Sequence, residues 1–262
     1  ISLQPMTPAQ QKFLQRNQLL ESYLKTAENW YRPLLEDFTK QQASGRSGTR
    51  IIGINGCQGS GKSTLADYLC TSIAEQHDIR TVALSLDDFY LSKAERAQLA
   101  KDIHPLLATR GVPGTHDVDL AIATINSLVQ AKSDTLITRF DKSTDDRLAP
   151  DHCEIIQGPV GLIVLEGWCM GATAQEPSAL ATAINELEAL DDAYAVWRTY
   201  VNNTLAVDYQ RLFGLADTLL MLRAPSFDTV FKWRLEQEQK MAKPLMNDAE
   251  ILRFIQYYQR IT

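Results

Sequence analysis

Cysteine is scarce in this 262-residue chain, and its spacing argues against two kinds of site. The four cysteines, Cys57, Cys70, Cys153 and Cys169, form no C-x-x-C pair. Structural zinc sites and disulfide-stapled domains both place cysteines at short, recurring spacings. We therefore expect four reduced thiols in a cytoplasmic protein, with neither a zinc site nor a disulfide framework.

The chain also has no excess of positive charge and no long apolar run. Its net charge is −6, whereas a general nucleic-acid binder usually presents a basic face. No apolar run reaches the about 18 residues that a membrane-spanning helix needs, and no basic stretch leads into an apolar core as in a signal peptide. The N-K-x-D tetrad of GTPases is missing as well. We expect no nucleic acid and no membrane among the partners, and the oligomeric state stays open.

The sequence does contain a phosphate-binding loop between a strand and a helix. Gly56 is followed by four residues and then by Gly61-Lys62-Ser63-Thr64, the pattern G-x-x-x-x-G-K-[ST]. The apolar residues 51–54 predict a buried strand before the loop, and residues 62–76 predict an amphipathic helix after it. Glycines let the backbone curl so that its N–H groups and the helix N-terminus meet a phosphate. We predict that a nucleoside triphosphate is bound by Gly56, Cys57, Gln58, Gly59, Ser60, Gly61, Lys62, Ser63 and Thr64.

Within this loop two side chains have separate predicted roles. Lys62 is expected to reach the β- and γ-phosphates, and the hydroxyl of Ser63 is expected to bind Mg²⁺. Further apolar runs at residues 80–86, 135–141, 161–166 and 217–223 predict strands that alternate with helices. This alternation predicts an α/β fold of the P-loop NTPase type, with three α/β/α layers, a mainly parallel central sheet, and extra N-terminal and inserted helices.

Two carboxylates follow predicted strands at the edge where such a sheet binds its ligand. Asp87 ends the strand after the phosphate-loop helix, and Glu166 ends the apolar run GLIVLE. Phosphoryl transfer needs the γ-phosphate held, its charge neutralised and an acceptor hydroxyl aimed in line. We predict Asp87 as the catalytic base and Glu166 as an acidic residue near Mg²⁺, with Lys62 as the third catalytic residue. Asp88 is the weaker candidate, with a cap or an outer ligand as its expected role.

A second group of residues is a candidate for the pocket of the phosphate acceptor. Arg110 and His116 lie in the turn-rich segment RGVPGTHD, and Lys142 and Arg147 lie in the charged loop DKSTDDR. A guanidinium can grip a carboxylate with two parallel hydrogen bonds, so these cations favour an anionic substrate. Tyr90, close to Asp87, completes the predicted substrate contacts. Arg234 and Lys240 lie on the helix after the last strand, where a lid is expected, and Arg234 is predicted to bind the nucleotide from it.

The combination of these motifs resembles one kinase family. The segments GINGCQGSGKST, LSLDDFYL, RGVPGTHD, RFDKSTDDR, VLEGW and FKWRLEQEQKM are similar to those of the P-loop glycerate kinases, in the wider group of uridine kinase, phosphoribulokinase and bacterial pantothenate kinase. The resemblance covers the chain from about residue 30 onward. It implies Asp87 as base, Glu166 near Mg²⁺, the acceptor pocket around Arg110, His116, Lys142 and Arg147, and a lid at Arg234. Phe140 stands where these relatives often carry tyrosine.

The resemblance implies an ATP- and Mg²⁺-dependent kinase that phosphorylates a small anionic acceptor, D-glycerate, to 3-phosphoglycerate. Two alternatives stay open: a kinase for pantothenate or a nucleoside, the latter stacked on Tyr90 or Trp168, and a regulatory protein that binds ATP without transferring phosphate. We predict residues 1–48 as a helical extension and residues 49–262 as the P-loop kinase domain, with a helical insertion at about 172–215 and a lid at about 232–247. In the extension, residues 7–40 are expected to form two helices, the first with Pro8, after Thr7, at its first position and the second starting after Asn29 with Pro33 near its beginning.

Overall fold

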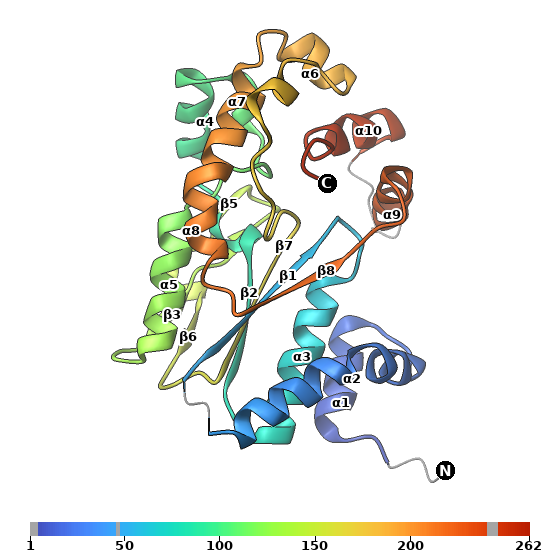
Figure 1. Ribbon diagram of the computed structural model, residues 1–262, viewed down its shortest axis with the longest axis vertical. Coiled ribbons are helices and arrows are strands. Elements are labelled where there is room, and N and C mark those ends of the chain that lie inside the picture. The colour runs from blue at the N-terminus through green and yellow to red at the C-terminus, as the bar shows by residue number, and fades with distance from the viewer. Residues whose placement is uncertain (1–4, 46–47, 240–245) are drawn as a thin grey trace.

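The computed structural model describes residues 5–45, 48–239 and 246–262. A parallel sheet with the strand order β2-β7-β1-β8 forms its centre (Figure 1). The strands are β1 Arg50–Gly56, β2 Thr81–Ser85, β7 Leu162–Gly167 and β8 Thr218–Leu222. Every residue of β7 is buried, as expected of an inner parallel strand covered on both faces. The α/β fold with a mainly parallel sheet is thereby confirmed.

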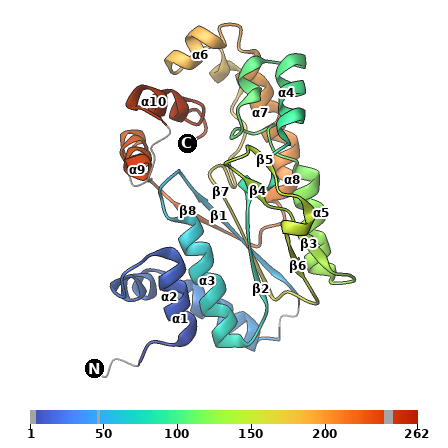
Figure 2. The ribbon, with the colours of Figure 1, turned by 180° about the vertical axis from the view of Figure 1, so that it is seen from behind.

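Helices cover the two faces of this sheet, and alternating side chains decide which face each residue serves. Ile52 and Val164 belong to the cluster packed against one helix layer, whereas Ile51 and Leu165 belong to the cluster on the other side. The first layer consists of α1 Pro8–Asn17, α2 Ser22–Ala43 and α3 Lys62–His77. The second contains α5 Val118–Gln130 and α8 Gln210–Phe213. Figure 2 shows the two layers from behind.

The N-terminal helices differ from their prediction in one respect. Helix α1 begins at Pro8, as predicted, and Thr7 caps it with a complete capping box. The break then falls between Asn17 and Ser22, and α2 runs on through Pro33. The predicted break after Asn29 was wrong, because the buried stripe of α2 continues across the proline. Since Pro33 is exposed, water can satisfy the carbonyl that loses its helical partner.

Residues 135–141 form two short strands outside the central sheet. β3 Thr135–Ile137 pairs antiparallel with β6 Glu154–Ile156. Next to it, β4 Phe140–Asp141 pairs with β5 Asp146–Arg147 in a small hairpin. Ile137 is fully buried while Leu136 is 38% exposed, the one-sided burial of a small antiparallel sheet.

The remaining α-helices, with one π-helix, lie around the carboxyl ends of the strands (Figure 1). They are α4 Lys93–Asp102, α6 Glu186–Asp191, α7 Val196–Thr204, a π-helix Leu205–Tyr209, α9 Phe227–Gln239 and α10 Asp248–Gln256. The predicted insertion at 172–215 contains α6, α7, the π-helix and α8. Residues 240–245 of the predicted lid, with Lys240, lie outside the described residues. The domain boundaries stay a prediction. None of the described helices has the length and apolar character needed to cross a membrane.

Candidate active site

The phosphate loop runs from the end of β1 to the first turn of α3. Gly59 and Gly61 have φ angles of +80° and +88°, which side chains with a Cβ rarely adopt. A Cβ at Gly56 would lie 2.5 Å from the Ser60 Oγ, so the loop closes too tightly for a larger residue. Cys57 is buried, and this burial raises the pKa of its thiol. The loop therefore offers a phosphate its backbone, and the first N–H groups of α3 have no partner within the helix.

Helix α9 packs directly on this loop. A Cβ at Gly59 would lie 2.8 Å from the Cβ of Trp233. The neighbouring Arg234 places its guanidinium carbon 5.4 Å from the ring centre of Phe254 on α10. The start of the predicted lid is thus next to the phosphate loop, and nucleotide binding by Arg234 stays a prediction.

The predicted magnesium residues lie in direct contact. Ser63 Oγ donates a hydrogen bond to Glu166 Oε1 at 2.7 Å. Sheet register explains this meeting, because Glu166 on β7 lies beside Ile54 on β1, just ahead of the loop. Burial raises the pKa of Glu166, with Lys62 and the Ser63 hydroxyl acting in the opposite direction. Lys62 itself donates to the carbonyl of Cys57 at 3.1 Å.

Asp87 lies just beyond β2 and is held by two side chains. Lys142 Nζ is 2.6 Å from Asp87 Oδ2, and the Tyr90 hydroxyl donates to Asp87 Oδ1 at 2.9 Å. Burial alone would raise the pKa of Asp87, but Lys142, with smaller contributions from His116 and the Tyr90 hydroxyl, outweighs it and the net shift is downward. Asp87 is therefore an ionised carboxylate at neutral pH, the form that can accept a proton.

Two sequence segments that are distant in the chain are joined here by the backbone. Leu91 N–H donates to the carbonyl of Thr115, and Asp117 N–H donates to that of Phe89. The segment after Asp87 thereby runs antiparallel to the RGVPGTHD turn. Trp168 then holds the start of the same turn, because its indole N–H donates to the Gly111 carbonyl at 2.8 Å.

His116 is buried between two aromatic residues. Tyr90 stacks on its ring with centroids 4.4 Å apart, and the Tyr209 hydroxyl lies 2.6 Å from His116 Nδ1. Gly114 N–H donates to the same hydroxyl at 3.0 Å. Burial lowers the pKa of His116 to about 4, partly opposed by the charge of Asp87. His116 is thus a neutral ring beside the candidate base.

We expect this buried histidine to make the stability of the protein depend on pH. The folded-state pKa of His116 lies below the ordinary value of 6.5, so the unfolded chain takes up the proton first as the pH falls. The free energy of unfolding should decrease below pH 6.5, by about 1.4 kcal/mol per pH unit from this group. Urea unfolding between pH 7 and 5 measures it. His116→Gln should flatten the slope and the exposed control His152→Gln should not, and equal slopes in all three proteins would contradict the assignment.

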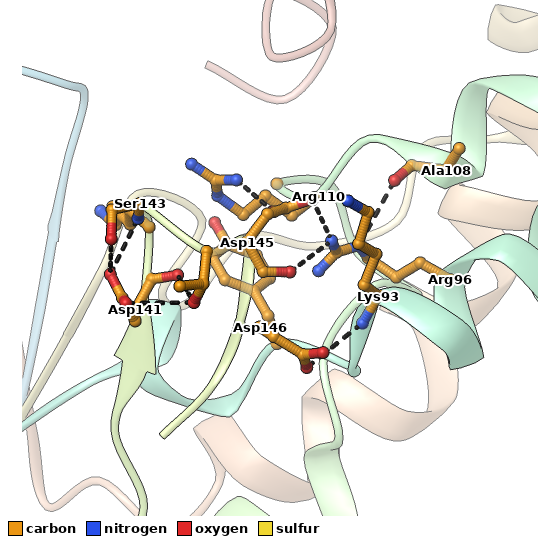
Figure 3. A network of polar contacts seen from close by, with 12 residues as sticks. Lys93, Arg96, Ala108, Arg110, Asp141, Ser143, Asp145 and Asp146 are labelled. Carbon is orange, nitrogen blue, oxygen red and sulfur yellow. Dashed lines mark hydrogen bonds and ion pairs between the residues drawn. The ribbon is translucent and has the colours of Figure 1, made fainter. Parts of the chain in front are cut away.

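The three cations and the histidine predicted for the acceptor pocket do not share one environment. Arg147 donates to the Tyr90 carbonyl at 2.8 Å and lies 3.0 Å from Asp117 Oδ2, so its guanidinium ties the hairpin to the site. Arg110 instead pairs with Asp145 at the hairpin tip (Figure 3). The side chains of Lys142 and Arg110 are 61% and 30% exposed, and that of Arg147 is 24% exposed.

Sequence reasoning missed two residues of the site and identified the local role of another. Asp88 caps the turn after β2, which is one of the two roles expected for it. It also pairs with Arg139 at 2.7 Å. Asp145 lies in the quoted segment DKSTDDR but was given no role. Tyr209 was missed because it lies 93 residues from His116 and carries no local signal. The roles of the predicted site residues in binding and catalysis stay proposals.

Comparison with known proteins places the chain among kinases, although no family model matches it. It is 33% identical over 233 residues to the "Uncharacterized kinase mug58" of Schizosaccharomyces pombe, covering 84% of this chain and 82% of that one. It is 28% identical over 227 residues to the chloroplastic D-glycerate 3-kinase of Arabidopsis thaliana, spanning 79% of this chain and 46% of the plant protein. The D-glycerate 3-kinase structure from Cryptococcus neoformans has the same fold, with a TM-score of 0.73, 24% identity, and coverage of 89% of this chain and 86% of its own. The chain therefore belongs to the P-loop kinases related to D-glycerate 3-kinase and is an ATP-dependent kinase.

Proposed function

We propose that this kinase transfers the γ-phosphate of ATP to the 3-hydroxyl of D-glycerate, giving 3-phosphoglycerate. The observation that carries the proposal is the pairing of the Asp87 carboxylate with Lys142 and Tyr90, and Arg110 lies within electrostatic reach of Tyr90. D-glycerate can offer its 3-hydroxyl to the carboxylate of Asp87 and its own carboxylate to the cations. The 28% identity to a plant D-glycerate 3-kinase supports the same acceptor.

Burial of two aromatic rings argues against a nucleoside acceptor. Tyr90 is 3% exposed and stacked on His116, and Trp168 is 5% exposed and packed edge-on to Tyr258. Neither ring presents a free face on which a base could stack. A smaller acceptor, which needs charge pairing more than stacking, fits these surroundings better.

The buried pair of Ser63 and Glu166 fits a magnesium ion. Glu166 is 7% exposed and has no ion-pair partner within 4 Å among the described residues, so a cation would offset its buried charge. Magnesium in nucleotide sites takes one or two protein oxygens and completes its shell with phosphates and water. Mg²⁺ held by Ser63 and Glu166 would neutralise charge on the transferred phosphoryl group.

The residues of the chain supply the remaining steps of transfer. The phosphate loop and Lys62 hold the β- and γ-phosphates, and Lys142 and Arg110 hold the acceptor by its carboxylate. Asp87 accepts the proton of the acceptor hydroxyl while the hydroxyl oxygen bonds to the γ-phosphorus. At the same time the bond between that phosphorus and the oxygen that leaves with ADP breaks. Helix α9, lying against Gly59, would shield the phosphates from water.

A coupled assay of ADP release tests the proposal. D-glycerate, L-glycerate, pantothenate and uridine are offered as acceptors, and the phosphorylated product is identified by ³¹P NMR. Turnover is expected with D-glycerate and phosphate on the 3-oxygen. Turnover with pantothenate or uridine alone would contradict D-glycerate as the acceptor. ATP binding without turnover of any of the four compounds would support the regulatory alternative.

We expect Lys142 to set the acid limb of the pH–rate profile. Lys142→Met removes the ammonium that lowers the pKa of Asp87, so this pKa should rise. The limb of kcat/KM that reports ionisation of the base should move to higher pH. The exposed Lys101→Met on α4 provides the control, since it should leave the limb in place. An unmoved limb in Lys142→Met would show that Asp87 is not the group that titrates.

A further inference from the structure

Two arginines share one carboxylate at the tip of the β4–β5 hairpin. Asp145 accepts from Arg96 Nη2 at 2.6 Å through Oδ2 and pairs with Arg110 Nη1 through Oδ1 (Figure 3). Phe140 lies beneath both guanidinium groups, each 5.6 Å from its ring centre. The three charges leave one net positive charge in this cluster.

Arg96 is the fixed member of the cluster. Its side chain is 1% exposed, and it donates to the carbonyls of Leu91 and Ala108 as well as to the backbone and carboxylate of Asp145. The segments that contain Leu91, Ala108 and the hairpin residue Asp145 are therefore all bonded to one buried guanidinium. Asp145 holds this place with a left-handed backbone, φ +58°.

Arg110 is the open member. Its Nε and Nη2 atoms have no hydrogen-bond partner among the residues that the structure describes, and its side chain is 30% exposed. With Nη1 held by Asp145, the edge formed by Nε and Nη2 keeps a fixed direction. Such an edge donates two parallel hydrogen bonds to a carboxylate.

We propose that Asp145 is a positioning residue for acceptor recognition: anchored by Arg96, it orients Arg110 so that the Nε–Nη2 edge receives the carboxylate of the acceptor. The inference rests on the proposed function, since it requires an acceptor with a carboxylate. It also explains why a buried arginine and a hairpin tip converge on this point. The proposal assigns a specificity role to a residue that need not touch the substrate.

The direction in which KM changes when Asp145 is substituted distinguishes a positioning role from a purely electrostatic effect of its charge. Removing the negative charge of Asp145 makes the cluster more positive, which by electrostatics alone would tighten binding of an anion and lower KM. Loss of orientation should instead raise KM. Asp145→Asn keeps a residue that tolerates a left-handed backbone, and Asp145→Gly deletes the side chain without backbone strain. Asp146→Asn, one residue along and without contact to Arg110, is the matched control.

Steady-state kinetics with D-glycerate and its neutral amide tests the proposal. Asp145→Asn and Asp145→Gly should raise KM for D-glycerate about tenfold or more, with kcat and KM for ATP within about twofold. KM for the amide should not change. In an Arg110→Ala background, Asp145→Asn should add nothing further, because it acts through Arg110. A lowered or unchanged KM, or a full additional effect in that background, would overturn the inference.

Failure of the inference and failure of the proposed function give different results. A wild-type protein that turns over D-glycerate, with Asp145 variants of unchanged KM, refutes only the role of Asp145. If pantothenate is the acceptor, the same variants are measured with it, since it also carries a carboxylate. A wild-type protein that phosphorylates only a neutral acceptor such as uridine overturns both proposals.

Discussion

Asp87→Asn is expected to lower kcat by about 10²–10⁴-fold while leaving ATP binding within about twofold, because a positioned general base contributes rate enhancement of this size. Asparagine keeps the shape of the side chain and still accepts the Tyr90 hydroxyl, which is 2.9 Å from Asp87 Oδ1. It cannot accept the proton of the acceptor hydroxyl. Single-turnover rates and ATP titration by calorimetry separate the two effects.

Asp88→Asn is the matched control for this experiment. The two aspartates are adjacent on the same turn, but Asp88 caps it and pairs with Arg139 at 2.7 Å. Its substitution should cost stability, on the order of 1 kcal/mol, and change kcat by less than about threefold. A comparable loss in both variants would mean that the turn, and not the Asp87 carboxylate, matters for the rate. Unchanged turnover in Asp87→Asn would remove the residue from the role of base.

The donor half of the site could be read from the sequence because its signals are local. The loop residues lie next to one another in the chain, and an apolar run predicts a strand without any information on the strands beside it. Glu166 could be predicted because it ends an apolar run, and the carboxyl ends of parallel strands lie at one edge of the sheet. Its contact with Ser63 then follows from the register of β1 and β7.

The acceptor half depends on pairings that no local pattern encodes. Arg110 and Arg147 are both cations in loop or turn segments. Arg110 pairs with Asp145 through Nη1, whereas Arg147 binds the Tyr90 carbonyl and Asp117. Tyr209 reaches His116 through the packing of the π-helix, a device common near functional sites. The misplaced helix break near Pro33 has a related cause, because tertiary burial of one helix face overrode a local proline signal.

Lys62→Ala is expected to impair both steps of the reaction. Lys62 is the charged donor of the phosphate loop, and its ammonium lies at the loop, where it donates to the carbonyl of Cys57 at 3.1 Å. Loss of one preorganised donor to the developing charge should lower kcat by about 10²–10³-fold. Loss of a charge-assisted hydrogen bond should also weaken ATP binding by about tenfold or more. Calorimetry and single-turnover kinetics measure the two effects, with the exposed Lys25→Ala on α2 as control.

The double variant of Lys62 and Asp87 shows whether the two residues act in one step. If Lys62 stabilises the same transition state in which Asp87 takes the proton, the double variant should be far less impaired than the product of the two single losses. Multiplicative losses would instead indicate that Lys62 serves ATP binding and Asp87 serves transfer, as independent functions. A Lys62→Ala protein with unchanged kcat would show that the phosphate loop holds the nucleotide without helping to transfer its phosphate. The predicted donor and acceptor residues both lie near Glu166, which feels the charges of Lys62 and Asp87, so coupling between Lys62 and Asp87 is the expected outcome.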